Sequence, residues 1–130
     1  RNLQKTKSVA KLLGCEYLDF NKRRIWSEAP YDILVHTTPT GMQDDECLLL
    51  DSEIPENKIV FDVVNKKTKT ALIRKSKEKF CDCIDGKDLF YEQAVLQFML
   101  WFKKEGISRE KVAQLLGDSL SDFSSSQAVS

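Results

Sequence analysis

The chain has 130 residues, of which 42% are hydrophobic and 31% are charged. This composition is typical of a soluble globular protein. The length suffices for one domain with its own core and is too short for two. The 20 basic and 20 acidic residues cancel, which excludes a global field that attracts nucleic acid or an anionic membrane. No apolar run approaches the roughly 18 residues that a membrane span needs. Four cysteines that we expect to be reduced and packed predict a cytoplasmic protein.

The cysteines predict reduced, packed thiols and no metal site. Cys81 and Cys83 are spaced C-x-C in a strand-like run, and Cys15 and Cys47 are isolated. The one histidine, His36, is far from them in sequence, so the usual spacing of zinc ligands is absent. We expect His36 to be a satisfied core residue rather than a catalyst.

Strands and helices alternate along the chain. Short apolar runs rich in β-branched residues predict strands at 15–20, 31–36, 59–64 and 80–84. Helical spacing predicts helices at 5–13, 70–79, 85–102 and 108–116, with Gly14 as a C-terminal cap and Ser108 as an N-cap. The Ser-rich segment 118–130 is expected to be a disordered tail after a domain spanning 1–117.

This order predicts an α/β fold, a parallel sheet with helices on both faces. Ligands of such sheets bind beyond the carboxyl ends of the strands, which here follow His36, Val64 and Ile84. After the first, Thr38 and Gly41 could contact a ligand or simply form a turn. After the second, a lysine-rich loop could bind an anion at a helix start or merely be solvated; its lysines are Lys66, Lys67 and Lys69.

The helix at 85–102 is apolar on nearly every side and is expected to be buried. Its amides, Gln93 and Gln97, would then need partners within an apolar face. Neighbouring loop carbonyls or a ligand could supply them. The helix at 108–116 is amphipathic and could dock a partner protein.

Three segments, in order, resemble the carboxyl-terminal, nucleotide-binding domain of shikimate dehydrogenase. The segment Asp32–Met42 resembles that family's D-I-L-I-N-T-T-P-x-G-M. The residues Asp62-Val63-Val64 with Thr70-Ala71-Leu72 resemble D-V-V-Y…T-P-L. The segment 85–101 resembles D-G-x-x-M-L-V-x-Q-A-x-x-Q-F-x-x-W. The resemblance covers roughly residues 1–102 and implies a Rossmann-like fold that lacks its first βαβ unit with the Gly-rich loop. We expect the chain to be a piece of a longer polypeptide.

The resemblance also implies roles for particular residues. Arg1, Asn2 and Lys5 match the family's N-R-T-x-x-K/R segment and would hold the adenosine phosphate of the cofactor NADP, with Thr38 lining the cofactor. Val63 and Gly86 would meet the nicotinamide through backbone contacts. Gln93 would bind a hydroxyl of shikimate, near a substrate-facing position held here by Asn65. The family's catalytic Lys and Asp lie in an amino-terminal substrate domain, so no catalytic residue is expected in this chain.

The implied activity is the reversible, NADP-dependent oxidation of shikimate to 3-dehydroshikimate. The chain departs from the family at His36 (usually Asn), at Asn65 (commonly Tyr) and at Lys87-Asp88-Leu89 (usually L-G-M). These departures leave open a quinate or shikimate dehydrogenase of altered specificity, or a noncatalytic binding domain that keeps the fold. A dehydratase domain fused upstream, as in bifunctional members of the pathway, is also left open.

Overall fold

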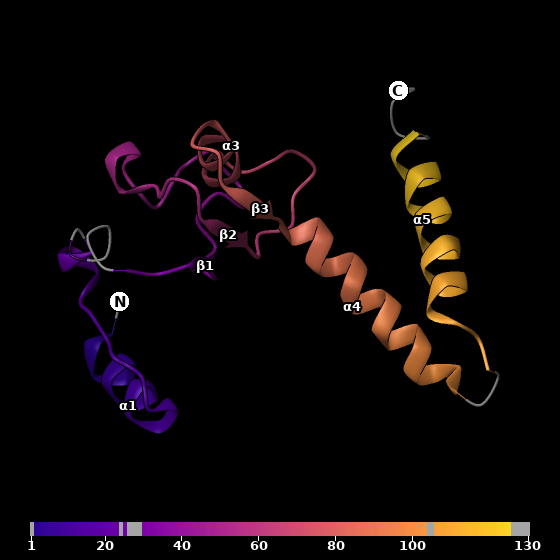
Figure 1. Cartoon of the computed structure of the whole chain (residues 1–130), viewed down its shortest axis with the longest axis horizontal. Helices are drawn as coiled ribbons and strands as arrows, with labels where there is room; N and C mark the ends of the chain where they lie inside the picture. The colour runs from indigo at the N-terminus through magenta and orange to yellow at the C-terminus, as the bar shows by residue number, and fades with distance from the viewer. Residues whose placement is uncertain (1, 24, 26–29, 104–105, 126–130) are drawn as a thin grey trace.

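The computed structural model describes residues 2–23, 25, 30–103 and 106–125. Its centre is a parallel sheet in the order β1 (Ile33–His36), β2 (Ile59–Asp62) and β3 (Asp82–Ile84) (Figure 1). Ile33 lies opposite Ile59, and Ile59 lies opposite Asp82. The predicted α/β class and parallel sheet are confirmed, with strands a few residues shorter than expected.

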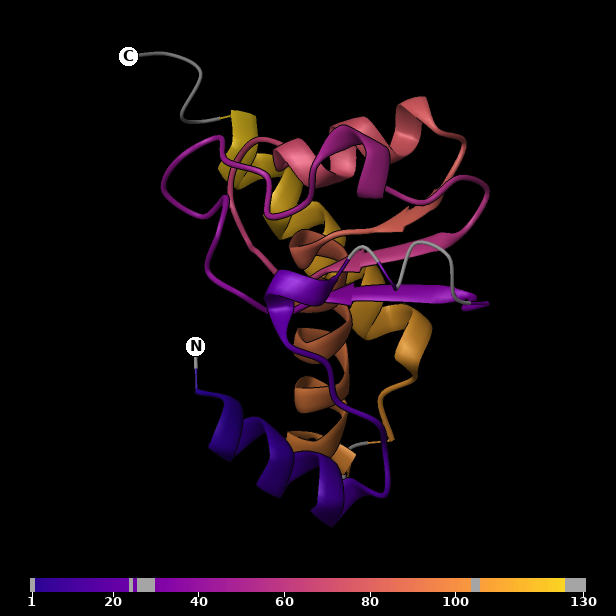
Figure 2. The same cartoon turned by 90° about the vertical axis from the view of Figure 1, so that its left-hand side faces the viewer.

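Among the described residues a helix covers one face of the sheet, whereas Ile33, Val35 and Ile84 on the other face are exposed, so the expected helix on that second face is not found there. The helices are α1 (Leu3–Leu13), α3 (Ala71–Glu78), α4 (Gly86–Trp101) and α5 (Arg109–Ser125), with single turns of 3₁₀ helix at η1 (Phe20–Lys22) and η2 (Asp51–Glu53). α3 packs on β2 and β3, whereas α4 leads away from the end of β3 and α5 packs beside it. α1 lies apart from the sheet in both views (Figures 1 and 2).

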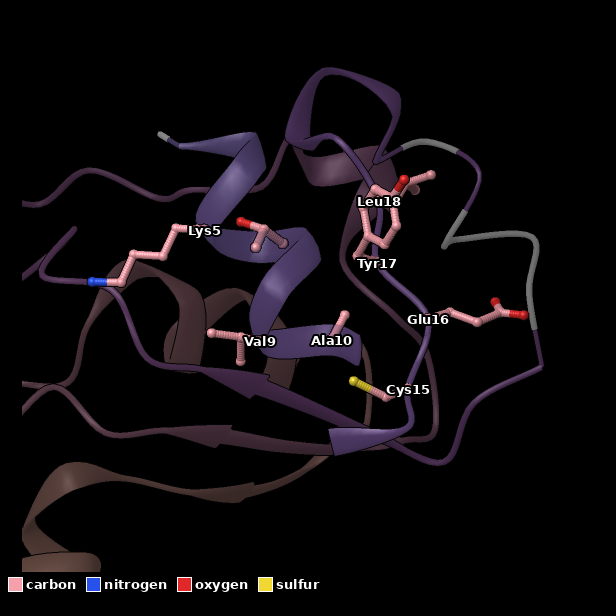
Figure 3. A pocket seen from close by; sticks show the side chains of 8 residues that line it. Lys5, Val9, Ala10, Cys15, Glu16, Tyr17 and Leu18 are labelled. Atoms are coloured by element: carbon pink, nitrogen blue, oxygen red, sulfur yellow. The ribbon is translucent and has the colours of Figure 1, made fainter. Parts of the chain in front are cut away.

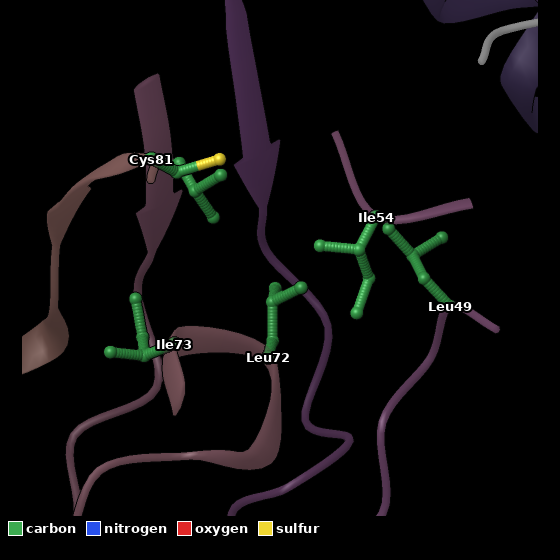
Figure 4. Packing of buried hydrophobic residues seen from close by; sticks show 6 residues of the cluster. Leu49, Ile54, Leu72, Ile73 and Cys81 are labelled. Carbon is green, nitrogen blue, oxygen red and sulfur yellow. The ribbon is translucent and has the colours of Figure 1, made fainter. Parts of the chain in front are cut away.

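The core lies between α3 and one face of the sheet. Leu34, Val60 and Cys83 are in register and share that face. Val60 and Ile73 are almost fully buried, and each such side chain stabilises the fold by about 1.5–3 kcal/mol. Figure 4 shows the α3 side chains of this core with those of the loop that leads to β2; the cluster comprises Leu49, Ile54, Val60, Leu72, Ile73 and Cys81. The position of the core therefore fixes which side of the sheet α3 covers.

The prediction of a strand at 15–20 is wrong. Gly14 ends α1 in the left-handed conformation, with φ of 66°, and the chain then runs irregularly to η1, which Asp19 caps by accepting a hydrogen bond from the Asn21 N–H at 2.9 Å. A run of alternating side chains forms a strand only where a neighbouring strand pairs with it. The sequence pattern does not contain that information.

The expected burial of α4 is also wrong for the described part of the chain. Within α4 only Gly86 and Val95 are buried, and both Gln93 and Gln97 are exposed. One side of α4 packs on α5, where the Tyr91 hydroxyl donates to the Ala113 carbonyl at 2.7 Å. The amides therefore carry no cost of burial. The apolar side chains on the other sides of α4 are exposed, among them Phe90, Leu96, Leu100 and Trp101.

The last helix is longer than predicted. α5 continues to Ser125, beyond the predicted end at 116, and the disorder expected of the Ser-rich tail stays a prediction. Residues 126–130 lie outside the described residues, and the domain boundary at 117 stays a prediction. Among the described residues, no helix is both long and apolar enough to cross a membrane.

We predict that replacing Ser76 with alanine stabilises the protein slightly. Ser76 of α3 is fully buried, and its Oγ has no hydrogen-bond partner among the described residues. Removing an unpaired buried hydroxyl should raise the free energy of unfolding by about 0.5–1 kcal/mol, measured by urea denaturation. The control is Ser8→Ala in α1, an exposed serine whose hydroxyl does have a partner, the Gln4 carbonyl at 3.1 Å. A loss of stability for Ser76→Ala would show that the hydroxyl has a partner.

Candidate functional site

The ends of the three strands meet at one edge of the sheet. Because the strands are parallel, His36 at the end of β1 lies opposite Asp62 at the end of β2, and β3 ends beside them at Ile84. The loops that follow these strands carry Thr38, Val63 and Gly86. The structure thus brings together three residues that the sequence predicted as cofactor contacts.

A hydrogen-bonded network joins β1, β2 and α3 at this edge. Asp62 Oδ1 lies 2.9 Å from His36 Nδ1, and Asp62 Oδ2 accepts from the Thr70 hydroxyl at 2.6 Å. His36 Nε2 lies 2.6 Å from Thr38 Oγ1. Asp62 is fully buried, and His36 is 6% exposed. The prediction of a satisfied core histidine is confirmed, and its partner is a carboxylate that the sequence did not identify.

Asp62 is an ionised carboxylate in this network. Burial would raise its pKa, but hydrogen bonds from His36, from Thr70 and from the backbone N–H of Val64 outweigh burial and place the pKa below its ordinary value. The Thr70 hydroxyl also accepts from the N–H of Ile73 at 3.3 Å and so caps α3. One threonine therefore links the end of β2 to the start of α3.

Gly86 permits the closest backbone approach at the edge. A Cβ at this position would lie 2.3 Å from the Val64 carbonyl oxygen and 2.6 Å from the Asn65 nitrogen, far inside van der Waals contact. The missing side chain thus lets the start of α4 sit on the end of β2. The requirement for glycine here comes from packing within the protein.

Asp85 caps α4 and joins it to the loop after β2. Its Oδ1 accepts from the N–H groups of Lys87 and Asp88 at 2.9 and 3.2 Å, and Asp88 accepts in return from the Asp85 N–H at 3.0 Å. Lys69 Nζ donates to Asp85 Oδ2. Burial would raise the pKa of Asp85, but Lys69 and the two backbone donors lower it. This carboxylate therefore holds two loops of the edge together.

The lysine-rich loop after β2 is engaged within the protein. The ammonium group of Lys66 donates to the Asp44 carbonyl at 2.8 Å, and that of Lys69 pairs with Asp85. The hydrogen bond to Asp85 raises the pKa of Lys69. The sequence predicted that these lysines either bind an anion or are solvated, and it did not predict their contacts within the protein.

Two of the predicted phosphate contacts, Asn2 and Lys5, lie at the start of α1, away from the sheet edge. Asn2 caps α1 by accepting from the Lys5 N–H at 3.0 Å; Arg1 lies outside the described residues. Lys5 lines a pocket of about 460 Å³ between α1 and residues 15–18. Figure 3 shows the side chains of Ala10 and Cys15 facing each other there, with Lys5 and Glu16 extending in opposite directions.

The two predicted substrate contacts, Asn65 and Gln93, are both exposed. Asn65 lies against the start of α4 through its backbone. Gln93 lies two helical turns beyond Gly86, a rise of roughly 10 Å along the helix. The structure thus places Asn65 at the edge and Gln93 further along α4.

A small apolar pocket adjoins the network on the β1 side. It has a volume of about 220 Å³ and is lined by residues of β1 and its loop together with Phe20, Leu48, Leu49 and Leu72. Among the described residues, no group of three or more His, Cys, Asp or Glu side chains is placed to hold a metal ion. All four cysteines are free thiols.

Comparison with known proteins gives a consistent set of relatives in sequence. No protein-family model matches the chain. It is 33% identical over 105 residues to the shikimate dehydrogenase (NADP(+)) of Maridesulfovibrio salexigens, covering 75% of this chain and 37% of the relative. The Bacillus subtilis enzyme of that name is 35% identical over 77 residues, 58% of this chain and 28% of the enzyme. The Sulfolobus acidocaldarius enzyme is 30% identical over 117 residues, which cover 89% of this chain and 41% of that enzyme.

The fold agrees with these sequences. A crystal structure of a shikimate dehydrogenase in complex with NADP+ superposes with a TM-score of 0.57 at 20% identity, over 88% of this chain and 41% of that one. The predicted Rossmann-like fold is thereby confirmed. The chain spans between 28% and 41% of the length of the relatives cited above. The chain is thus similar in sequence to parts of shikimate dehydrogenases and shares the Rossmann-like fold of one of them.

Proposed function

We propose that this chain binds NADP+ at the carboxyl edge of its sheet and serves as the nucleotide-binding domain of an NADP-dependent shikimate dehydrogenase. The observation that carries the proposal is the meeting of Thr38, Val63 and Gly86 at one edge, in a chain whose relatives are named for NADP and shikimate. Parallel α/β sheets bind their ligands at this edge.

Donor groups that suit a dinucleotide lie in two places, at the sheet edge and at the start of α1, which lies apart from the sheet. Thr38 offers a partly exposed hydroxyl at the edge. Asn2 and Lys5 lie at the start of α1, where the partial positive charge of the helix and the Lys5 ammonium group suit a phosphate, and Arg1 would add a guanidinium. When bound, the nicotinamide supplies the hydride chemistry. The residues of this chain hold and orient it.

The catalytic Lys and Asp, and the main contacts to shikimate or 3-dehydroshikimate, would belong to an amino-terminal substrate domain of the same polypeptide, with or without a fused dehydratase. The compartment would be the cytoplasm. The substrate would lie between that domain and the edge described here, near Asn65 and Gln93.

A noncatalytic binding domain, or a quinate-type enzyme, is the second candidate. It is favoured by the segment Lys87-Asp88-Leu89, where Asp88 completes the cap of α4 and Lys87 Nζ donates to the Lys67 carbonyl at 2.8 Å. These contacts occupy the turn where the family usually has L-G-M.

Two measurements on the intact protein test the proposal. Calorimetry with NADP+ measures binding, and the formation of NADPH with shikimate or quinate, followed by absorbance, measures turnover. Binding with shikimate-dependent turnover supports the dehydrogenase, and binding without turnover on either substrate supports the noncatalytic domain. If NADP+ does not bind, both the dehydrogenase and the noncatalytic binding domain are excluded.

Replacing Gln93 with alanine is expected to raise the KM for shikimate about 3- to 10-fold, the loss of one hydrogen bond. NADP+ affinity and folding should stay unchanged because the side chain is exposed. Steady-state kinetics measures the effect. Gln97→Ala, an exposed amide one helical turn along α4, is the matched control. Equal KM values in the two variants would remove Gln93 from the substrate site.

A further inference from the structure

His36 is a buried titratable group that the proposed function does not use. It bridges the fully buried Asp62 and the partly exposed Thr38, with contacts of 2.9 and 2.6 Å from its two ring nitrogens. Thr38 is the residue of this network that a cofactor could reach. The protonation state of His36 can therefore affect the exposed surface through the Thr38 hydroxyl.

The hydrogen positions in this network follow from the chemistry of its members. An ionised Asp62 only accepts hydrogen bonds, so His36 Nδ1 carries a hydrogen and donates to it. In neutral His36, Nε2 is then an acceptor, and the Thr38 hydroxyl must donate to it. The Thr38 oxygen meanwhile lies 3.4 Å from the N–H of Thr40, from which it accepts. In this state Thr38 offers a ligand lone pairs but no hydrogen.

Protonation of His36 reverses this arrangement. Nε2 then carries a hydrogen and donates to Thr38 Oγ1, which frees the hydroxyl hydrogen to turn outward. Thr38 becomes a donor for an acceptor group such as a phosphate or carbonyl oxygen. The imidazolium also adds a positive charge behind the hydroxyl.

We propose that His36 is a positioning residue that sets whether Thr38 donates or accepts at the sheet edge, so that binding of NADP+ is coupled to uptake of a proton by His36. This inference rests on the proposed function. The family's usual amide at this position cannot change its charge, so the coupling is a property of this chain's own histidine.

Among the described residues, one ionisable side chain contacts His36 and can influence its protonation. That side chain is Asp62 of β2. The side chains that share its pocket from η1, from the loop before η2 and from α3 are apolar: Phe20, Leu48, Leu49 and Leu72. The next polar group, Thr70, donates to Asp62 and does not titrate.

The test compares proton uptake and NADP+ affinity in the intact protein and in His36→Asn. Calorimetry in buffers of different ionisation enthalpy counts the protons taken up. We expect proton uptake on binding, and a dissociation constant that falls as the pH is lowered across the physiological range. Because the phosphates of NADP+ titrate in this range too, the readout is the difference from His36→Asn, in which the uptake should shrink and the dependence on pH should flatten.

Two Thr38 variants separate positioning from a structural effect. Thr38→Ser keeps the hydroxyl and should keep the proton uptake, whereas Thr38→Val should lose it although His36 remains. Nitrogen-15 spectra of the unmodified protein give a measurement that needs no variant to fold: neutral His36 should carry its hydrogen on Nδ1.

The outcomes distinguish this inference from the proposed function. Absence of NADP+ binding at every pH overturns both. Binding with identical proton uptake in the unmodified protein and in His36→Asn overturns the inference alone, as does a neutral His36 with its hydrogen on Nε2.

Discussion

Gly86→Ala should destabilise the protein by at least about 3 kcal/mol, the largest effect expected of a single methyl group in this chain. The added Cβ would lie 2.3 Å from the Val64 carbonyl oxygen. The group it meets is backbone at the end of β2, which cannot rotate aside as a side chain can. Either α4 must shift at its first residue or the end of β2 must move, and both carry the proposed cofactor contacts.

Chemical denaturation of the intact protein measures the loss, and NADP+ affinity should fall with it. The matched control is Gly117→Ala in α5, whose Cβ would come no nearer than 3.9 Å to the Tyr91 hydroxyl. That variant should be neutral or slightly stabilising, because alanine favours a helix over glycine by up to about 1 kcal/mol. Equal stability of the two variants would show that β2 and α4 are not in contact at this point.

Asp62→Ala is expected to cost about 3–5 kcal/mol. The carboxylate is the common acceptor for His36, for Thr70 and for the Val64 N–H. Its removal leaves these buried donors without their partner and opens a space beside them. Asp82→Ala, at an exposed position in β3, should change stability by less than about 0.5 kcal/mol. If the two variants were equally stable, the network would not contribute to folding.

The same carboxylate predicts a dependence of stability on pH. Its folded pKa is lowered, so its contribution is fully present above the unfolded value of about 3.9 and is lost as pH falls through the folded value. Asp85, whose pKa is also lowered, acts in the same direction. Denaturation at a series of acid pH values should show a smaller loss of stability in Asp62→Ala than in the unmodified protein. Parallel curves would contradict this.

Much of the fold could be predicted from local pattern. The apolar runs located β1, β2 and β3, and helical spacing predicted a helix at 70–79, close to the observed α3 with its N-cap Thr70. The strand at 15–20 failed because pairing depends on a distant partner. The prediction that α4 is buried was wrong. Apolar composition indicates that a helix must pack against other residues, but it does not show that the described part of the chain provides them.

The candidate site was predictable in its position but not in its chemistry. The rule for strand ends pointed to the segments after His36, Val64 and Ile84, the first of which holds Thr38, and the resemblance to shikimate dehydrogenase added Val63 and Gly86. The partnership of His36 with Asp62 depends on register between strands 26 residues apart, and that of Lys69 with Asp85 on how two loops fold back. A signal did exist for the first pair, since two polar residues each end an apolar strand of a parallel sheet.

The double role of Thr70 has a dynamic consequence. Its hydroxyl caps α3 through the N–H of Ile73 and also donates to Asp62. The first turn of α3 therefore cannot fray without releasing the carboxylate that orders His36 and, through it, Thr38. Local unwinding of this helix and loosening of the sheet edge are then one cooperative opening rather than two independent motions.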